Sequence, residues 1–241
     1  MGSSVPVWPT FAAPSRRLAR LTAPCFCARK PLPEAPHLAR MTTEDDAAGR
    51  LEKQFRFLTE MDRLKRVERQ NILTDRSRRE NSAEHSWHLA VLALCLSEHA
   101  VADRVDLFRV VQLLLIHDIV EIDAGDAFLH EPEALAAQAT KESAAATRIF
   151  GLLPDDQRDS WIALWHEFES GTSAESVLAR ALDRVQPALL HEATDGVIWQ
   201  KYGTTHAQIQ AKMQVVREAA PRLWERVQQI IARARSQGKL V

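Results

Sequence analysis

The segment VDLFRVVQLLLIHDIVEI, at residues 105–122, restricts the possible folds of this chain more than any other segment, because it is apolar on nearly every side. It is longer than an ordinary strand, so it predicts a central helix that is packed on all faces. His117 and Glu121 lie one helical turn apart on the face that also carries Leu114, and Asp118 is next to them. Ionisable groups in such a setting are costly to bury unless they are paired or bind a cation. These three residues are therefore candidates for a functional site.

Helical patterns also cover most of the chain after residue 40. An apolar stripe recurs at steps of three or four: Leu51, Phe55, Leu58, Met61 and Leu64. A second helix is expected to begin near Asn81, which Glu84 can complete as a capping box, and Thr172 with Glu175 repeats this signal. Further helices are expected at about 132–151, 155–169, 173–195 and 206–236. No period-two run competes, so the prediction is an all-α fold, a single helical bundle.

The first 40 residues differ in composition from the rest. They hold seven of the eleven prolines, with six basic residues and one acidic residue. Such a stretch buries too little apolar surface to offset its ordering entropy, so it is predicted to be a disordered extension of a domain at residues 41–241, with core motifs at 82–190. The same composition suits an organellar transit peptide. The alternative is that translation starts at Met41.

Charge and cysteine usage limit the partners and the compartment. The chain has 31 basic and 32 acidic side chains, so no overall field attracts it to nucleic acid or to a membrane surface. Three cysteines cannot build a disulfide scaffold, and no apolar run is long enough to cross a bilayer. We therefore expect a small-molecule partner and a cytoplasmic location, or an organellar one if residues 1–40 are a transit peptide.

Two further polar residues lie in apolar helical settings like that of His117 and Asp118. His85 heads an apolar stripe of the second helix, and Asp183 interrupts the amphipathic segment VLARALDRVQPALL. Two imidazoles and two carboxylates suit Mn²⁺, Co²⁺, Fe²⁺ or Mg²⁺ better than the sulfur-rich sites of structural zinc. Taken singly, each has a structural alternative, such as pairing of Asp183 with Arg184.

These motifs resemble those of a known family. EHSWH at 84–88, HD at 117–118 and Asp183 are similar to the H…HD…D signature of HD-domain metal-dependent phosphohydrolases, with fitting spacings of 32 and 66 residues. The segments LKRVERQ, RRENSAEHSW, LLIHDIVEIDAGD and LLPDDQRDSWIALWHEFE resemble the HD-domain 5′-deoxynucleotidases and their near relatives. The resemblance spans roughly residues 50–235 and implies an HD-domain helical bundle.

The resemblance also implies roles for particular residues. A divalent cation is expected to be held by four of them: His85, His117, Asp118 and Asp183. Glu121 and Asp126 match catalytic carboxylates, which in some members help to hold a second ion. A phosphomonoester is anionic, so a metal must neutralise its oxygens, and Glu121 is placed to handle protons. Without the resemblance, Asp126 in the turn sequence DAGD would be given a structural role.

Three arginines are candidates for substrate binding. Arg69 matches the region that holds a phosphate-binding arginine in the deoxynucleotidases, and Arg78 and Arg79 precede the second helix, where guanidinium groups suit phosphate. Those enzymes also place an aromatic residue nearby that contacts the sugar. Here no Trp, Tyr or Phe lies between Phe57 and Trp87.

The leading prediction is a metal-dependent phosphohydrolase that removes phosphate from nucleoside 5′-monophosphates, with 5′-deoxynucleotides as the favoured substrates. One alternative is hydrolysis of a nucleoside triphosphate or an alarmone, which calls for more Lys and Arg around the pocket. Another is a non-catalytic metal-containing nucleotide sensor, which the presence of Glu121 and Asp126 disfavours. A homodimer is expected from the resemblance.

Overall fold

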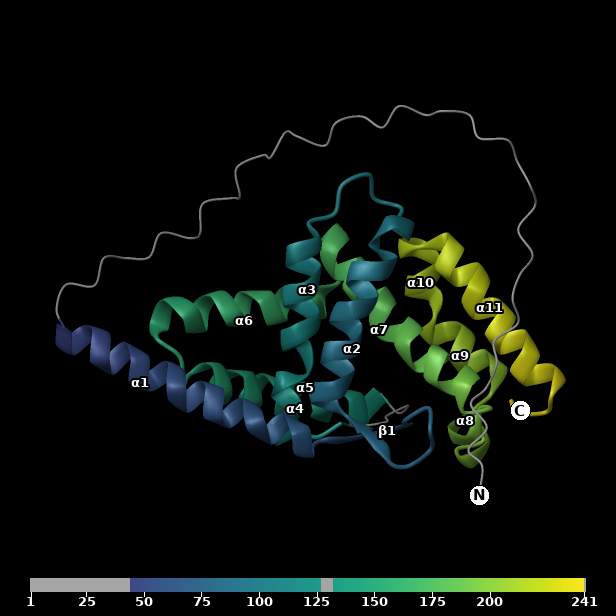
Figure 1. Cartoon of the computed structure of the whole chain (residues 1–241), viewed down its shortest axis with the longest axis horizontal. Coiled ribbons are helices and arrows are strands. Elements are labelled where there is room, and N and C mark those ends of the chain that lie inside the picture. The colour runs from purple at the N-terminus through teal and green to yellow at the C-terminus, as the bar shows by residue number, and fades with distance from the viewer. Residues whose placement is uncertain (1–43, 127–131, 241) are drawn as a thin grey trace, which may run out of the picture. The chain divides into compact units, whose positions relative to one another are not determined.

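The computed structural model describes residues 44–126 and 132–240 (Figure 1). The expectations for residues 1–40 and for a start at Met41 fall outside this part of the chain. The described residues are predominantly helical, so the predicted all-α fold is confirmed. No helix among them has the length and apolar composition needed to cross a membrane.

The N-terminal half of the described chain alternates helices with short 3₁₀ turns and one small hairpin. In chain order its elements are α1 (Glu44–Met61), η1 (Asp62–Arg66), β1 (Glu68–Ile72), β2 (Arg79–Asn81), α2 (Ser82–Leu96), η2 (Ser97–His99), α3 (Leu107–Ile116), η3 (His117–Val120) and α4 (Glu121–Ala124). The remaining elements are α5 (Pro132–Phe150), α6 (Asp155–Ser170), α7 (Ala174–Ala193), α8 (Val197–Lys201), α9 (His206–Lys212), α10 (Gln214–Ala219) and α11 (Pro221–Ser236).

Helix α7 is the element on which the others assemble. It contacts α2, α3 and α6 as well as α10 and α11, and Figure 1 shows it between these two groups. Its inward face carries buried apolar residues such as Leu178, Leu182 and Val185. The helix also buries Asp183 and Gln186. A polar pair inside the main core needs partners, and those partners define the site described below.

The predicted central helix is interrupted, contrary to expectation. The α-helical hydrogen-bond pattern ends at Ile116, and His117–Val120 form a 3₁₀ turn before α4 begins. The Nδ1 atom of His117 lies 2.9 Å from the Leu114 carbonyl oxygen, which an unbroken α-helix would offer to the backbone N–H of Asp118. The side chain thus competes for a backbone acceptor. Periodicity alone cannot reveal such a competition.

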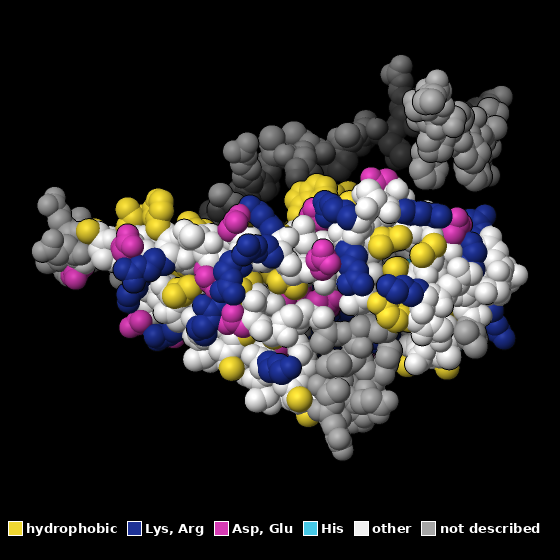
Figure 2. All heavy atoms as spheres, turned by 90° about the horizontal axis from the view of Figure 1, so that it is seen from below, with side chains coloured by type: hydrophobic (Ala, Val, Ile, Leu, Met, Phe, Trp, Pro, Cys, Tyr) yellow, Lys and Arg dark blue, Asp and Glu magenta, His cyan; other side chains and the backbone are white. Residues whose placement is uncertain are grey.

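The predicted stripe on the first helix was only partly correct. Leu51, Phe55 and Leu58 are more than half exposed, whereas Phe57 and Leu64 are buried. The helix therefore packs through a neighbouring face, and the Phe57 ring meets Trp161 of α6 edge-on, with ring centroids 4.9 Å apart. Burial of such an aromatic side chain contributes about 1.5–3 kcal/mol. Figure 2 shows hydrophobic side chains raised above the surface in separate groups among charged ones.

The N-terminal caps of two helices were predicted from the sequence, and one of the two is present. The capping box of Asn81 and Glu84 is present, as predicted. The box predicted at Thr172 was wrong, because Ser173 caps α7 and pairs with Ser176.

The predicted helix over 206–236 is three helices, since Pro221 has no backbone N–H and disfavours the α conformation at the residue before it. The β1–β2 hairpin was missed because its strands are short, polar and without alternation.

Candidate metal centre and the cleft beside it

His85 is fixed by the start of α2 and by α7. The capping box sets the first turn of α2, and this turn places the imidazole in the core with no exposed surface. Its Nδ1 lies 3.1 Å from Oε1 of Gln186, an atom that can only accept, so Nδ1 donates the proton. Its Nε2 lies 3.0 Å from Asp183 Oδ1 and 3.8 Å from Asp118 Oδ2. This tautomer directs the Nε2 lone pair toward the carboxylates.

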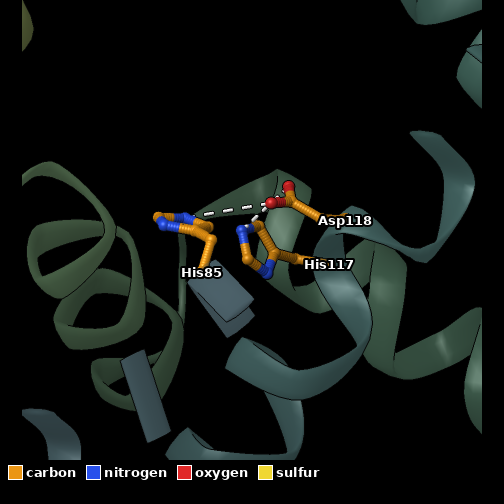
Figure 3. A group of neighbouring side chains, drawn as sticks. All are labelled: His85, His117 and Asp118. Atoms are coloured by element: carbon orange, nitrogen blue, oxygen red, sulfur yellow. Dashed lines mark ion pairs between the residues drawn. The ribbon is translucent and has the colours of Figure 1, made fainter. Parts of the chain in front are cut away.

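His117 has the same arrangement in the 3₁₀ turn. Because Nδ1 donates to the Leu114 carbonyl, Nε2 is the ring nitrogen directed toward the carboxylates, and no described residue makes a hydrogen bond of normal geometry with it. This Nε2 lies 2.9 Å from Asp118 Oδ1 and 3.9 Å from Asp183 Oδ1. Figure 3 shows His85 and His117 facing Asp118 from different elements. An imidazole whose Nδ1 donates to a carbonyl is oriented as metal-ligating histidines are.

The four residues form a possible site for a divalent cation. Ligand atoms of His85, His117 and Asp118 all lie within 4.8 Å of one another, and Asp183 Oδ1 is close to both imidazoles. The buried, unpartnered Nε2 of His117 fits a cation as its missing partner. Two nitrogen and two oxygen donors suit Mn²⁺, Fe²⁺, Co²⁺ or Mg²⁺. The structure therefore brings together the four residues that the sequence selected.

The charges of these groups depend on one another. Burial alone would raise the pKa of Asp118, but the charges of His117 and Arg69 outweigh it and lower the pKa to about 2. Burial would lower the pKa of His117, but the Asp118 carboxylate outweighs it and raises the pKa to about 9. Burial would also raise the pKa of Asp183, but the influence of Arg184 and His85 outweighs it. The pKa of Asp183 therefore lies well below the ordinary range. Both aspartates are thus ionised at neutral pH.

Glu121 and Asp126 lie beside this group. Glu121 is buried, and its Oε2 accepts a 2.5 Å hydrogen bond from Ser82 Oγ. Burial, reinforced by the Asp118 charge, raises the pKa of Glu121 well above its ordinary value. Asp126 follows Gly125, whose φ of +75° is a conformation that a side chain would strain. Burial raises the pKa of Asp126 as well.

Among the three predicted arginines, the structure brings only Arg69 to the centre. Arg69 extends from β1, and its Nη1 donates to Asp118 Oδ2 at 2.8 Å. Burial opposes its charge, but Asp118 and Glu121 outweigh burial and raise its pKa further. Arg78 instead makes a two-point ion pair with Glu84 at the surface. Neither Arg78 nor Arg79 is among the described residues that line the chamber at the centre.

Three residues of the site were missed by the sequence analysis. Gln186 donates from Nε2 to Glu80 Oε1 at 2.6 Å while its Oε1 accepts from His85, so the buried Glu80 supports His85 indirectly. Arg184, considered only as a partner of Asp183, also lines the chamber. Gln186 lies three residues after Asp183 on one helical face, a signal that could have revealed it. Glu80 gave no signal, because the hairpin was not predicted.

Two neighbouring hollows open onto the centre. The first, called the chamber, has a volume of about 170 Å³ and contains His117, Asp118, Glu121 and Asp183 in its wall. The second, called the side cavity, has a volume of about 190 Å³ and is formed largely by α7, α8 and α9. Arg69, Asp126 and Arg184 line both. The two hollows are therefore adjacent.

An all-α bundle with this H…HD…D arrangement defines an HD-domain protein. The sequence profile described as the HD domain matches residues 61–224, so the chain belongs to the HD domain family. The human protein named 5′-deoxynucleotidase HDDC2 is 31% identical over 136 residues, which are 56% of this chain and 65% of that protein. The mouse protein of the same name is 30% identical over 136 residues, 56% of this chain and 66% of that protein. The matches thus cover slightly less than two thirds of these relatives.

A solved structure is similar over its whole length. The crystal structure of a predicted metal-dependent phosphohydrolase from Magnetospirillum magnetotacticum superposes with a TM-score of 0.77. Its sequence is 42% identical, and the match covers 83% of this chain and all of that one. This match covers more of the chain than the matches to the human and mouse proteins do.

Proposed function

We propose that this protein is a metal-dependent phosphomonoester hydrolase that releases phosphate from nucleoside 5′-monophosphates, with 5′-deoxynucleotides preferred. One observation carries the proposal: a buried set of two imidazoles and two aspartates faces a chamber that also holds Glu121 and Arg69. The names of the relatives support both the metal and the substrate class.

In this mechanism His85, His117, Asp118 and Asp183 would hold the cation, as Mn²⁺, Co²⁺, Mg²⁺ or Fe²⁺. When bound, it would neutralise the phosphoryl oxygens and make a water molecule more acidic. Arg69 would bind the phosphate, because its guanidinium is already held at the chamber wall by Asp118. Arg184, in the wall of both hollows, would contribute a second positive charge.

Glu121 would transfer protons during the reaction. A carboxyl group with a raised pKa holds its proton at a higher pH than an ordinary carboxyl group, which suits it to act as a general acid or base. Ser82 fixes one of its oxygens, so the other is the one available to the substrate or to a water molecule. Asp126 would act with it, and the two carboxylates together could hold a second ion.

The composition of the chamber favours a monoester over the alternatives. Among the described residues in its wall there are two arginines and six carboxylates: Asp118, Glu121, Asp126, Glu142, Glu169 and Asp183. A triphosphate or an alarmone brings several negative charges, which this wall would repel. A non-catalytic nucleotide sensor would have no need for Glu121 and Asp126 in the chamber.

Phosphate release from a nucleotide panel tests the proposal. Metal-stripped protein resupplied with Mn²⁺, Co²⁺ or Mg²⁺ is expected to release inorganic phosphate from 5′-deoxynucleotides, and less from 5′-ribonucleotides or 3′-nucleotides. Metal-stripped protein without added metal is the control. Release of pyrophosphate or tripolyphosphate from a triphosphate would favour the first alternative, and metal binding without turnover would favour the sensor.

We propose that two copies of the chain associate through α2 and α3. These adjacent helices expose Trp87 and Leu94 to 65% and Phe108 to 70%, which is unusual for such large apolar side chains. Sedimentation velocity of the full chain is expected to give a dimer, and Leu94→Glu is expected to give a monomer. A monomeric wild-type protein would contradict this assignment.

Domain organisation and location are proposed from composition. Residues 41–241 would form the HD domain with residues 1–40 as an extension, and the protein would be cytoplasmic unless this extension directs it to an organelle. Imaging the full chain and a chain beginning at Met41, each with a C-terminal fluorescent tag, compares these options. An organellar signal seen only with the full chain would favour the transit peptide.

A further inference from the structure

The side cavity adjoins the chamber, because the two hollows share wall residues. Arg69, Asp126 and Arg184 belong to both hollows, so their charged ends mark the passage between them. A phosphomonoester bound with its phosphate at the metal centre must send its organic part somewhere. Among the described residues, this passage leads to a hollow large enough for a ring system.

Apart from these three residues and Lys212, the wall of the side cavity is uncharged and largely apolar. Pro187 of α7, Ile198 and Trp199 of α8, and Ile209 of α9 form much of it. Neutral polar groups are also present, as Gln70 and other amide side chains line the same hollow. Aromatic and apolar surface with a few polar groups is the usual lining of a small-molecule site. A heterocyclic ring suits it better than a sugar alone.

His191 gives the side cavity a distinctive polar group. Its ring lies against Trp199, with centroids 4.2 Å apart, and it is buried. Burial lowers its pKa to about 4, so it is neutral at physiological pH and offers one donor and one acceptor. Within residues 44–126 and 132–240, its ring nitrogens have no hydrogen-bond partner. The ring nitrogens of His191 are therefore available to a ligand in the side cavity.

Gln208 adds a second polar group with a defined orientation. Its Oε1 accepts from the backbone N–H and the hydroxyl of Thr205 in the cap of α9. This capping contact holds the side-chain amide in place and leaves its Nε2 group as a donor. A fixed amide and a neutral imidazole can together distinguish the polar edge of a heterocyclic base.

The cavity also supplies an aromatic contact that the sequence around Arg69 lacks. Gln70 follows Arg69 on β1, and the Tyr202 hydroxyl, just after α8, donates a hydrogen bond to its Oε1. Trp199 reaches the cavity from the same segment, which begins at Gly196 with φ of +66°. This turn favours glycine because a side chain at the positive φ of Gly196 would be strained. The aromatic surface therefore comes from α8 rather than from the hairpin.

We infer that the side cavity binds the nucleobase of the substrate, and that His191, Trp199 and Gln208 determine the preference for nucleotides over sugar phosphates. The inference rests on the proposed phosphomonoesterase function, because the phosphate must lie in the chamber. Trp199 contributes aromatic contact, and His191 and Gln208 contribute hydrogen bonds to the base edge.

The test compares two esters that differ by the base. For metal-loaded full-length protein, kcat/KM is measured with 2′-deoxyadenosine 5′-monophosphate and with 2-deoxyribose 5-phosphate. His191→Phe keeps an aromatic ring but removes both ring nitrogens. It is expected to lower the kcat/KM for the nucleotide, relative to that for the sugar phosphate, about tenfold, mainly through a higher KM for the nucleotide. Gln200→Ala, an exposed position on α8, is the matched control and is expected to keep the wild-type ratio.

Two outcomes would overturn the inference. One is an unchanged ratio in a folded His191→Phe protein, including an equal loss on both esters, which indicates a structural role. The other concerns nucleoside binding. Calorimetry with 2′-deoxyadenosine itself separates this inference from the proposed activity. If the wild type hydrolyses neither ester, the activity is wrong, yet nucleoside binding that His191→Phe weakens and Gln200→Ala preserves would still support the cavity. Absence of nucleoside binding to the wild type would overturn it.

Discussion

Replacing Asp118 by asparagine is expected to remove the bound cation and to lower phosphate release by at least about 1000-fold. Asp118 contributes an oxygen between the two imidazoles, and its negative charge raises the pKa values of His117 and Arg69 more than any other group does. Asparagine keeps the shape but removes the charge that attracts a cation. His117→Ala is expected to have the same effect, because it removes a nitrogen ligand.

Metal content after dialysis, measured by mass spectrometry, is compared with phosphate release for each variant. Asp123→Asn is the matched control, because Asp123 lies on α4 and pairs with Arg148 outside the chamber. Loss of one member of a buried charge cluster costs about 3–5 kcal/mol, so circular dichroism must first confirm that each variant is folded. A folded Asp118→Asn protein that keeps the full metal content would contradict the assigned site.

Replacing Glu121 by glutamine is expected to preserve metal binding and to lower kcat by about 100- to 10,000-fold. Glutamine keeps the size of the side chain and can still accept the hydrogen bond from Ser82, but it can neither take up nor release the proton. Steady-state kinetics together with metal content separate the two effects. Glu225→Gln, at an exposed position of α11, is the control.

The two ways in which this expectation can fail have different meanings. Unchanged turnover in Glu121→Gln would remove Glu121 from the proton transfer. Loss of about one metal ion per chain, with another ion retained, would instead assign Glu121 to a second metal position together with Asp126.

Sequence reasoning found those parts of the fold and the site that follow from local pattern. Apolar periodicity located α2, α3 and α7, and ionisable residues inside apolar helices pointed to His85, His117 and Asp183. Burying a charge is costly enough that such residues stand out in a single sequence. The structure brings their side chains together from three separate elements, as expected of a shared ligand.

Features that depend on tertiary contact were beyond this reasoning. The break at His117 depends on a side chain that takes the Leu114 carbonyl, and the face that α1 buries is selected by Trp161 of another helix. Glu80 and Gln186 are ordinary polar residues in the sequence, and only the fold joins them beneath His85. The side cavity is likewise assembled from helices that follow the motif-bearing part of the chain.

Helix α7 passes both hollows, with Asp183 at the metal centre and His191 in the side cavity. These residues are two helical turns apart, which corresponds to about 12 Å along the axis. If the proposed function and the inferred base site are correct, α7 would set the distance between the phosphate and the base. A ligand with additional phosphates would be too long to place its terminal phosphate at the metal centre and its base beside His191 at the same time. Selectivity for a single phosphate would therefore be set by the distance between two residues of one helix, independently of any repulsive charge.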